Sequence, residues 1–261
     1  MFPRWLEQKR QDKFSHYRRF LVLDIETIPD GEMMDFVMDE KERKKYEEGE
    51  FIHPAYHRVV AISVLRAANG GVEDFCSCAS EDEGSLLRKF WGIFSDSLRV
   101  DDDGREFPVF ITVNGKEFDI PVILLRSLKH AHYFDGNQIG ALVHFTDTSA
   151  DRFDIHHPNY GNPFTRYHID LARDIFGRRG VSLRKLAYLS GIPVKTEGKG
   201  EEVADYFRNG ELERIALYCA EDVKVTALVF SRINRFLFGF LYRDFPPFSQ
   251  IREVEPRLLI L

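Results

Sequence analysis

The chain has 261 residues, of which 44% are hydrophobic and 30% are charged, and this composition excludes a disordered or collagen-like polypeptide. Its 36 lysine and arginine residues against 42 aspartate and glutamate residues give a net charge of −6, which argues against broad electrostatic coating of nucleic acid or anionic membrane. The same charge still permits a nucleic-acid enzyme whose active site holds divalent cations.

Targeting signals and cysteines indicate the cellular setting. Residues 1–14 contain no apolar run of signal-peptide length, and the longest apolar stretch near the C-terminus, 236–242, is too short to cross a membrane. Three cysteines, Cys76, Cys78 and Cys219, are too few for a disulfide framework, and no cluster of cysteine and histidine completes a zinc site. We therefore expect buried free thiols in a soluble cytoplasmic protein.

The first half of the chain combines strand patterns with helical ones. Apolar runs predict strands over 20–24, 57–65 and 72–78. The last two form a hairpin, because Asn69-Gly70-Gly71 supplies a turn that accepts positive φ angles. Helical patterns cover the acidic, solvated stretch 30–50 and the amphipathic stretch 81–97.

The second half becomes increasingly helical. A strand over 108–113 precedes a helix over 119–130, whereas 131–165 shows no clear period and is expected to be a long loop or insertion. From Tyr167 onward the pattern is helical, with breaks at 177–180 and 191–193, and a strong 3.6-residue period predicts a last helix over 211–236. Early strands followed by late helices predict an α/β domain with a mixed sheet flanked by helices.

Two acids follow the first strand directly. Asp24 and Glu26 are two residues apart in an extended segment, so their side chains point to the same face. Two carboxylates this close repel each other unless a cation lies between them, and Mg²⁺ or Mn²⁺ prefers oxygen ligands of this kind. The alternative is a pair of solvated acids in the turn that follows the strand.

A second acidic motif follows the strand over 108–113. Asn114-Gly115 allows a sharp turn, and Asp119 followed by Ile120-Pro121 fits the N-cap of a helix. Capping alone is a sufficient structural explanation of Asp119. The functional alternative is that its carboxylate faces the edge of the sheet where Asp24 and Glu26 emerge.

A third motif lies on the last predicted helix. Tyr218 and Asp222 are four residues apart and share one helix face, at the border of the apolar stripe that runs through Cys219 and Val223. Such a border is where a helix can face a cleft. Taken alone, a tyrosine and an aspartate at this spacing are common on helix surfaces.

Together the three motifs resemble the tyrosine (DEDDy) branch of the 3′–5′ exonuclease superfamily, with its RNase H-like fold. The best match is to predicted stand-alone exonucleases related to the exonuclease domain of family-B DNA polymerases. Further segments support the resemblance: His57-Arg-Val-Val-Ala-Ile-Ser, His168-Ile-Asp-Leu171, Ser182-Leu-Arg-Lys-Leu-Ala and Tyr218-Cys-Ala-Glu-Asp222. It implies a single exonuclease domain over 18–234, with an N-terminal extension over 1–17 and a C-terminal extension over 235–261.

The resemblance also implies a role for each site residue. Asp24 would bridge two divalent metal ions, Mg²⁺ or Mn²⁺, with Glu26 and Asp222 on the ion beside the nucleophile and Asp119 on the other. Tyr218 would orient the attacking water, because a tyrosine hydroxyl is too weak a base to deprotonate water unaided. Residues implied in substrate binding are Asn114, Phe118 and Thr27, although core packing explains Phe118 equally well.

Other polar residues have weaker support. His156 and His157 are adjacent and rarely share a face, which argues against a metal pair. Lys195 and Lys199 fit phosphate contact and plain solvent exposure equally well. Asp170 fits a supporting acid better than a further metal ligand.

These observations favour a metal-dependent exonuclease that hydrolyses single-stranded nucleic acid from its 3′ end, with DNA favoured, by a two-metal-ion mechanism that releases nucleoside 5′-monophosphates. One alternative is a catalytically weak nucleic-acid-binding module of the same fold. Another is an α/β metal hydrolase that acts on small phosphoesters. No membrane partner is expected, and no pattern indicates an oligomeric state.

Overall fold

The strand that carries Asp24 and Glu26 lies in the middle of the main sheet. A computed structural model describes residues 17–101, 104–147, 158–162, 165–176, 180–193 and 202–261. Its main sheet has six strands in the order β7-β6-β1-β2-β3-β8. Their bounds are β1 Arg19–Pro29, β2 His57–Ala68, β3 Gly71–Ala79, β6 Pro108–Thr112, β7 His168–Asp170 and β8 Arg257–Ile260. β1, β2 and β3 pair antiparallel, whereas β6, β7 and β8 each join a neighbour in parallel.

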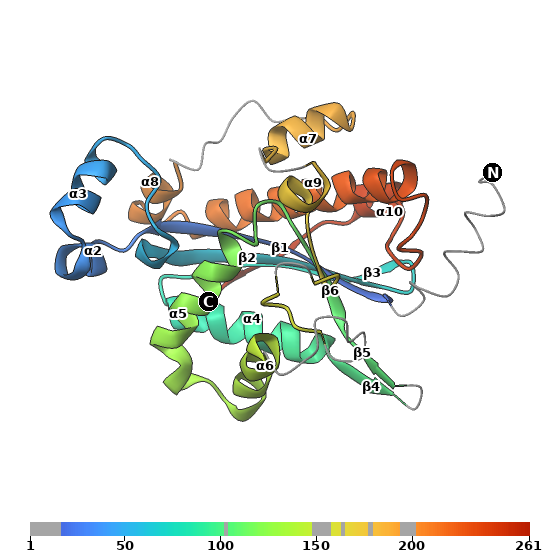
Figure 1. Ribbon diagram of the computed structural model, residues 1–261, viewed down its shortest axis with the longest axis horizontal. Coiled ribbons are helices and arrows are strands. Elements are labelled where there is room, and N and C mark those ends of the chain that lie inside the picture. Colours follow the sequence, from blue (N-terminus) through green and yellow to red (C-terminus); the bar gives the residue numbers. More distant parts are fainter. Residues whose placement is uncertain (1–16, 102–103, 148–157, 163–164, 177–179, 194–201) are drawn as a thin grey trace.

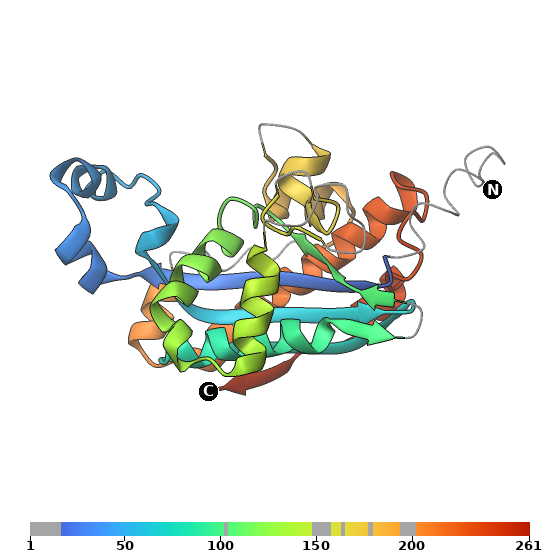
Figure 2. The same cartoon turned by 60° about the horizontal axis from the view of Figure 1, so that its bottom comes forward.

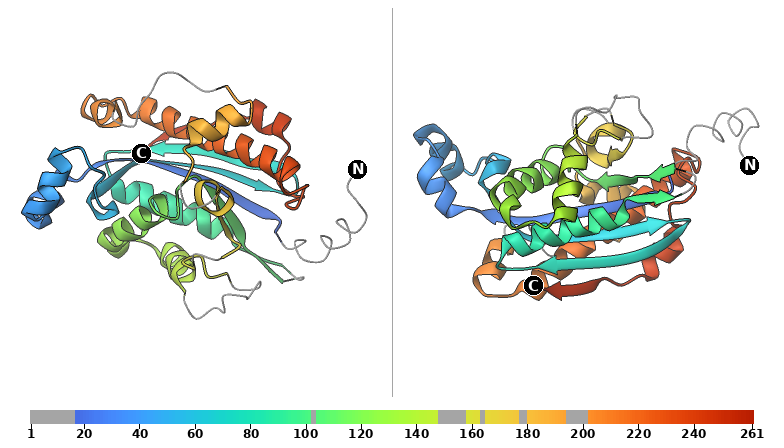
Figure 3. Two further views of the ribbon diagram at one scale, coloured as in Figure 1. Left: turned by 45° about the horizontal axis from the view of Figure 1, so that its top comes forward. Right: turned by 90° about the horizontal axis from the view of Figure 1, so that it is seen from below.

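Helices cover both faces of this sheet (Figure 1). One face carries α4 (Glu83–Ser97), α5 (Asp119–His130) and α6 (Gly136–Thr146). The other carries the long α9 (Leu212–Phe236), with α7 (Leu183–Leu189), α8 (Val203–Arg208) and α10 (Phe248–Glu253) packed against it. Figure 3 shows the two layers from further directions. The predicted α/β domain, a mixed sheet flanked by helices, is confirmed.

The central strands owe their position to continuous apolar runs. Phe20 to Leu23 of β1 are all buried, as expected for a strand covered by helices on both faces. The predicted hairpin joins β2 to β3, with Asn69 at φ 51° and Gly70 at φ 76° in its turn. Two successive positive φ angles match the twist of the flanking strands, which explains the sequence at this turn.

The acidic stretch 30–50 forms an arm that projects beyond the end of β1 (Figures 1 and 2). It contains α2 (Gly31–Val37) and α3 (Glu40–Glu47), which begin at the capping residues Asp30 and Asp39. A small apolar cluster of Met34, Met38 and Tyr56 holds the arm together. The 3-10 turn η1 (Pro54–Tyr56) then leads the chain into β2.

The stretch 131–165 is more regular than predicted. It contains the 3-10 turn η2 (Ala131–Tyr133) and α6, which begins with a capping box between Asp135 and Gln138. Within α6 only Ala141 and Phe145 are buried, so the helix presents too narrow an apolar stripe to be recognised from its period. The prediction of a long loop is therefore wrong for residues 136–146.

Three further segments differ from the sequence-based expectation. The helical pattern predicted from Tyr167 onward is interrupted by β7, a strand of three buried residues that is too short to show alternation, followed by the π-helical turn η3 (Leu171–Ile175). At the C-terminus, β8 pairs with β3 and extends the main sheet. A small separate hairpin joins β4 (Arg99–Asp101) to β5 (Gly104–Glu106). The domain boundaries at 17/18 and 234/235 stay a prediction.

The turn after β6 depends on a glycine. A Cβ atom on Gly115 would lie 2.5 Å from the Cβ and Oγ1 atoms of Thr112. We expect Gly115→Ala to lower the free energy of unfolding by about 1–3 kcal/mol, because the backbone must move to relieve this overlap. Gly92→Ala is the control: Gly92 lies inside α4 with open space around it, and the change should stabilise the helix by about 0.5–1 kcal/mol. Urea denaturation of both variants measures this, and equal stability changes would contradict the steric explanation.

Candidate active site

Asp24 and Glu26 emerge from the middle of the sheet. Asp24 is partly exposed, whereas Glu26 is buried at 9% exposure, and a β-bulge follows Glu26 in the pairing of β1 with β2. One ligand atom each from Asp24, Glu26 and Cys219 lies within 4.8 Å of the others. The two carboxylates therefore converge on one point, as their spacing predicted.

Asp119 reaches the same place from α5. It is 4% exposed, and its Oδ1 atom accepts a hydrogen bond of 3.2 Å from the backbone N–H of Ile25, the residue between Asp24 and Glu26. The N-cap position belongs to Phe118, and Asp119 is the first helical residue, so the prediction of a capping aspartate is wrong. Its carboxylate ties the helix to β1 instead.

Asp222 and Tyr218 complete the group from α9, and both are partly buried. The charge of Asp222 acts on Asp24 and on Glu26, and the Tyr218 hydroxyl lies in the field of all three carboxylates. Both residues also line a cavity of about 420 Å³ between α7 and α9. The structure thus brings together all five residues for which the sequence predicted a catalytic role.

Three carboxylates of this group, those of Asp24, Glu26 and Asp119, hold protons unusually strongly. Burial, followed by repulsion from Asp119, Asp222 and Glu26, raises the pKa of Asp24 well above its usual range. Burial and the charges of Asp222 and Asp119 do the same to the pKa of Glu26. Burial raises the pKa of Asp119 to about 7, although the N–H groups of Ile25 and of Asp119 itself oppose this shift.

A divalent cation fits this chemistry. Among the described residues, no lysine or arginine forms an ion pair with Asp24 or Glu26, so no described basic side chain compensates their negative charge. Several carboxylate oxygens converging in a poorly solvated place are the donor set that Mg²⁺ and Mn²⁺ prefer. The acidic group can therefore serve as a metal site, which is the chemistry predicted from the sequence.

Cys219 is a neighbour of the acidic group, although the sequence predicted only a buried thiol at this position. It is fully buried, and its thiol lies 3.4 Å from the backbone oxygen of Asp24 and 3.8 Å from its Oδ2 atom. Burial and the nearby Asp24 and Glu26 raise the pKa of this thiol well above its usual range. Cys76, Cys78 and Cys219 are all free and buried, as expected.

Asp170 holds the turn that leads to α5. Its buried carboxylate accepts hydrogen bonds from the backbone N–H groups of Asn114, Lys116 and Ala172 at 2.9–3.1 Å. This agrees with a supporting acid. The side-chain oxygen of Asn114 accepts from Arg173 at 3.2–3.3 Å, so Asn114 is turned toward η3. Its predicted contact with substrate stays a prediction.

Thr27 and Phe118, next in sequence to Glu26 and Asp119, belong to one cluster with the rings of Phe51 and His57. The Thr27 hydroxyl and the Nδ1 atom of His57 are 2.9 Å apart, and the His57 ring meets the Phe118 ring edge to face at 4.8 Å. Phe51 packs against both rings at 5.4 Å. The sequence marked His57 only as part of the family resemblance and did not mark Phe51, because their contacts with Phe118 join segments that are far apart in the chain.

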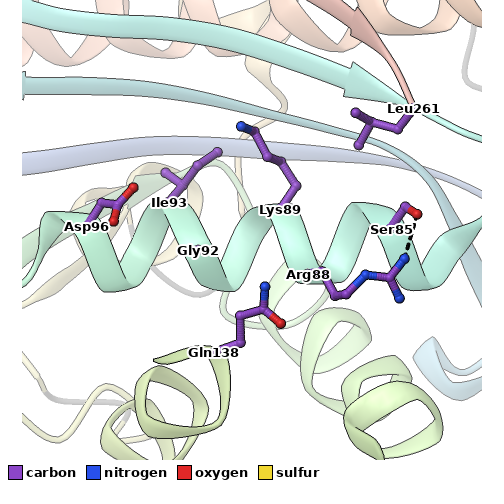
Figure 4. A pocket seen from close by; sticks show the side chains of 8 residues that line it. All are labelled: Ser85, Arg88, Lys89, Gly92, Ile93, Asp96, Gln138 and Leu261. Atoms are coloured by element: carbon purple, nitrogen blue, oxygen red, sulfur yellow. Dashed lines mark hydrogen bonds between the residues drawn. The ribbon is translucent and has the colours of Figure 1, made fainter. Parts of the chain in front are cut away.

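The structure does not test the remaining candidates. His156, His157, Lys195 and Lys199 lie outside the described residues. A second cavity of about 420 Å³ lies along α4 beside α6 and Leu261, and it contains none of the predicted site residues (Figure 4). Arg88 on its wall donates to the hydroxyl of Ser85 and pairs with Asp82.

Comparison with known proteins identifies the family. Residues 49–245 match the model of predicted 3′–5′ exonucleases related to the exonuclease domain of PolB. The chain belongs to this family. The model describes its members as predicted 3′–5′ exonucleases, which agrees with the resemblance seen in the sequence.

The matched range of this exonuclease family contains Asp119, Tyr218 and Asp222, whereas Asp24 and Glu26 precede it. The fold brings these two groups of residues together, because β1 lies between β2 and β6 and the Ile25 N–H donates a hydrogen bond to Asp119. The candidate site therefore combines residues inside the matched range with two residues that precede it.

Solved structures show more distant similarity. A product-bound structure of exonuclease I has a TM-score of 0.36 and 13% sequence identity, and the match covers 85% of this chain and 48% of that protein. An exonuclease I/SSB-Ct complex has a TM-score of 0.35 and 12% identity, and the match covers 86% of this chain and 46% of the other. This chain spans about half the length of those proteins. No curated protein matches the sequence significantly. Within the described residues, no helix has the length and apolarity needed to cross a membrane.

Proposed function

We propose that the protein is a metal-dependent 3′–5′ exonuclease that hydrolyses phosphodiester bonds at the 3′ end of single-stranded nucleic acid, with DNA favoured, and releases nucleoside 5′-monophosphates. The observation that carries this proposal is the convergence of carboxylates from β1, α5 and α9, of which Asp24, Glu26 and Asp119 have raised pKa values, with no basic partner on Asp24 or Glu26 among the described residues. Membership of the exonuclease family supports the same reading.

The four acids Asp24, Glu26, Asp119 and Asp222 would hold two divalent cations, Mg²⁺ or Mn²⁺. When bound, a pair of cations supplies Lewis-acid chemistry that acidifies water and offsets charge on the attacking and leaving oxygens of an in-line displacement. The backbone N–H of Ile25 fixes the carboxylate of Asp119, and Asp170 fixes the turn that precedes it. The site is thereby preorganised before substrate binds.

Tyr218 would orient the attacking water. Burial and the charges of Asp222, Glu26 and Asp24 raise the pKa of its hydroxyl, so the group stays protonated near neutral pH and can donate or accept a hydrogen bond. It is thus a positioning group and does not act as a base.

Tyr218→Phe tests this role. We expect kcat to fall by about 10- to 100-fold with little change in KM, because the ring stays in place while the hydroxyl that aligns the water is lost. Tyr188→Phe is the matched control, because Tyr188 is largely exposed on α7. Steady-state hydrolysis of a single-stranded oligonucleotide measures both variants, and an unchanged kcat for Tyr218→Phe would contradict the assignment.

Substrate class is tested with matched DNA and RNA oligonucleotides and with small phosphodiesters in Mn²⁺. Product analysis should show nucleoside 5′-monophosphates from single strands, with faster release from DNA. Equal turnover of small esters and oligonucleotides would favour a small-phosphoester hydrolase instead. Binding of oligonucleotides without turnover would favour a module that has lost catalysis.

A further inference from the structure

Phe51 is an aromatic side chain that the fold holds in place but does not bury. It is 74% exposed, although its ring stacks on His57 at 5.4 Å and 27° and meets Phe118 edge to face at 5.4 Å and 66°. It belongs to the segment between α3 and η1, where the arm returns to the sheet. Contacts on one side and high exposure overall leave much of its apolar surface open to solvent.

The rings beneath Phe51 are fixed to the sheet. His57 begins β2 opposite Pro29 of β1, and its Nδ1 atom is 2.9 Å from the Thr27 hydroxyl. Burial lowers the pKa of His57, so its ring is neutral near pH 7 and offers an aromatic face. Phe118 meets that ring at 4.8 Å. Phe51 therefore rests on two rigidly held rings.

Two residues of this cluster adjoin acids of the site along the chain. Thr27 follows Glu26 in β1, and Phe118 precedes Asp119 at the start of α5. A single nucleic-acid strand whose terminal phosphodiester lies at the carboxylates would have its nearest bases within reach of this aromatic cluster. Within the arm, residues 31–50 carry eight acidic against four basic residues, so the arm does not attract phosphates.

We propose that Phe51, supported by His57 and Phe118, is a stacking surface for one unpaired nucleobase near the 3′ end of the substrate. The inference deepens the proposed exonuclease function and rests on it. Stacking on an aromatic ring tolerates any base, because every base has a flat π face, and it requires that the base be unpaired. Phe51 thus gives the site a physical reason to prefer single strands despite its acidic surroundings.

The test compares wild type with Phe51→Ala, Phe51→Trp and the matched control Phe36→Ala. Phe36 lies on α2 of the same arm and is 86% exposed. We expect Phe51→Ala to raise the Kd and KM for a single-stranded oligonucleotide by about 5- to 100-fold, with kcat within about twofold, because base stacking is lost. Phe51→Trp should restore binding, and Phe36→Ala should behave as wild type.

A scan with abasic nucleotides identifies the stacked base. One base at a time is removed from the last four positions of the oligonucleotide, and binding is followed through the fluorescence of 2-aminopurine placed next to the removed base. Wild type should lose affinity at one position, and Phe51→Ala should show no loss there. Thermal denaturation should give nearly equal Tm values for all variants, because Phe51 is mostly exposed.

The outcomes separate this inference from the proposed function. If wild type binds through Phe51 but hydrolyses nothing, the exonuclease proposal fails and the stacking surface stands. If wild type is an active exonuclease and Phe51→Ala matches Phe36→Ala in Kd and in the abasic scan, the stacking inference is wrong. A wild-type protein that neither binds nor hydrolyses oligonucleotides overturns both.

Discussion

Replacing Asp24 by asparagine is expected to lower the rate of 3′-terminal hydrolysis by at least about a thousandfold, which corresponds to about 4 kcal/mol of transition-state stabilisation. Asp24 has a central place, because its carboxylate lies in the field of Glu26, Asp119 and Asp222 together. Asparagine keeps the shape and one oxygen of the side chain but removes the charge that would hold a cation. The loss should therefore appear in kcat at saturating Mg²⁺.

The control for this prediction separates catalysis from folding. Asp24→Asn removes one member of a repelling group, so the metal-free protein should be at least as stable as wild type in urea denaturation. Asp35→Asn, on the exposed surface of α2, should leave activity and stability unchanged. An Asp24→Asn protein that folds and keeps more than a tenth of the wild-type rate would contradict the proposed role of Asp24.

Replacing Asp119 by asparagine is expected to stabilise the metal-free protein, and more so as the pH rises. The folded-state pKa of Asp119 is about 7, whereas its usual value is 3.8. Between these two values the folded state binds more protons than the unfolded state, so this carboxylate makes the protein less stable as the pH rises from about 4 to about 7. The full penalty, present above pH 7, is at most about 4 kcal/mol.

Asparagine avoids this penalty and can still accept the hydrogen bond from the Ile25 N–H. The free energy of unfolding of Asp119→Asn relative to wild type, measured in urea and EDTA, should therefore rise from pH 4.5 to pH 7 and then level off. Added Mn²⁺ should stabilise wild type at pH 8 far more than the variant, because the cation compensates the charges that repel each other. A difference that does not depend on pH would show that Asp119 is already ionised in the folded protein at pH 4.5.

Local patterns in the sequence predicted most of the elements that hold the candidate site. The two-residue spacing of Asp24 and Glu26 put both on one face of a strand, and the four-residue spacing of Tyr218 and Asp222 put both on one face of a helix. Each spacing lies within one element, so no tertiary contact was needed to predict it. The period of the last helix was equally clear, and α9 covers 212–236.

The features that the sequence did not predict depend on contacts between distant segments. Asp119 looked like a helix cap because its bond to Ile25 joins residues 94 positions apart. Cys219 lies in the apolar stripe of α9, so only its contact with Asp24 marks it as a neighbour of the site. β7 has three residues, and its pairing with β6 rather than its own pattern makes it a strand.

The central claim is that a divalent cation at the acidic group drives hydrolysis from the 3′ end. One measurement tests it directly: a single-stranded oligonucleotide labelled at its 5′ end and the same oligonucleotide labelled at its 3′ end are incubated with the protein in Mn²⁺ or in EDTA. We expect Mn²⁺ to give a ladder of shortened 5′-labelled products and immediate release of the 3′ label as a mononucleotide, and we expect neither in EDTA. Release of the 5′ label first, or equal degradation in EDTA, would contradict it.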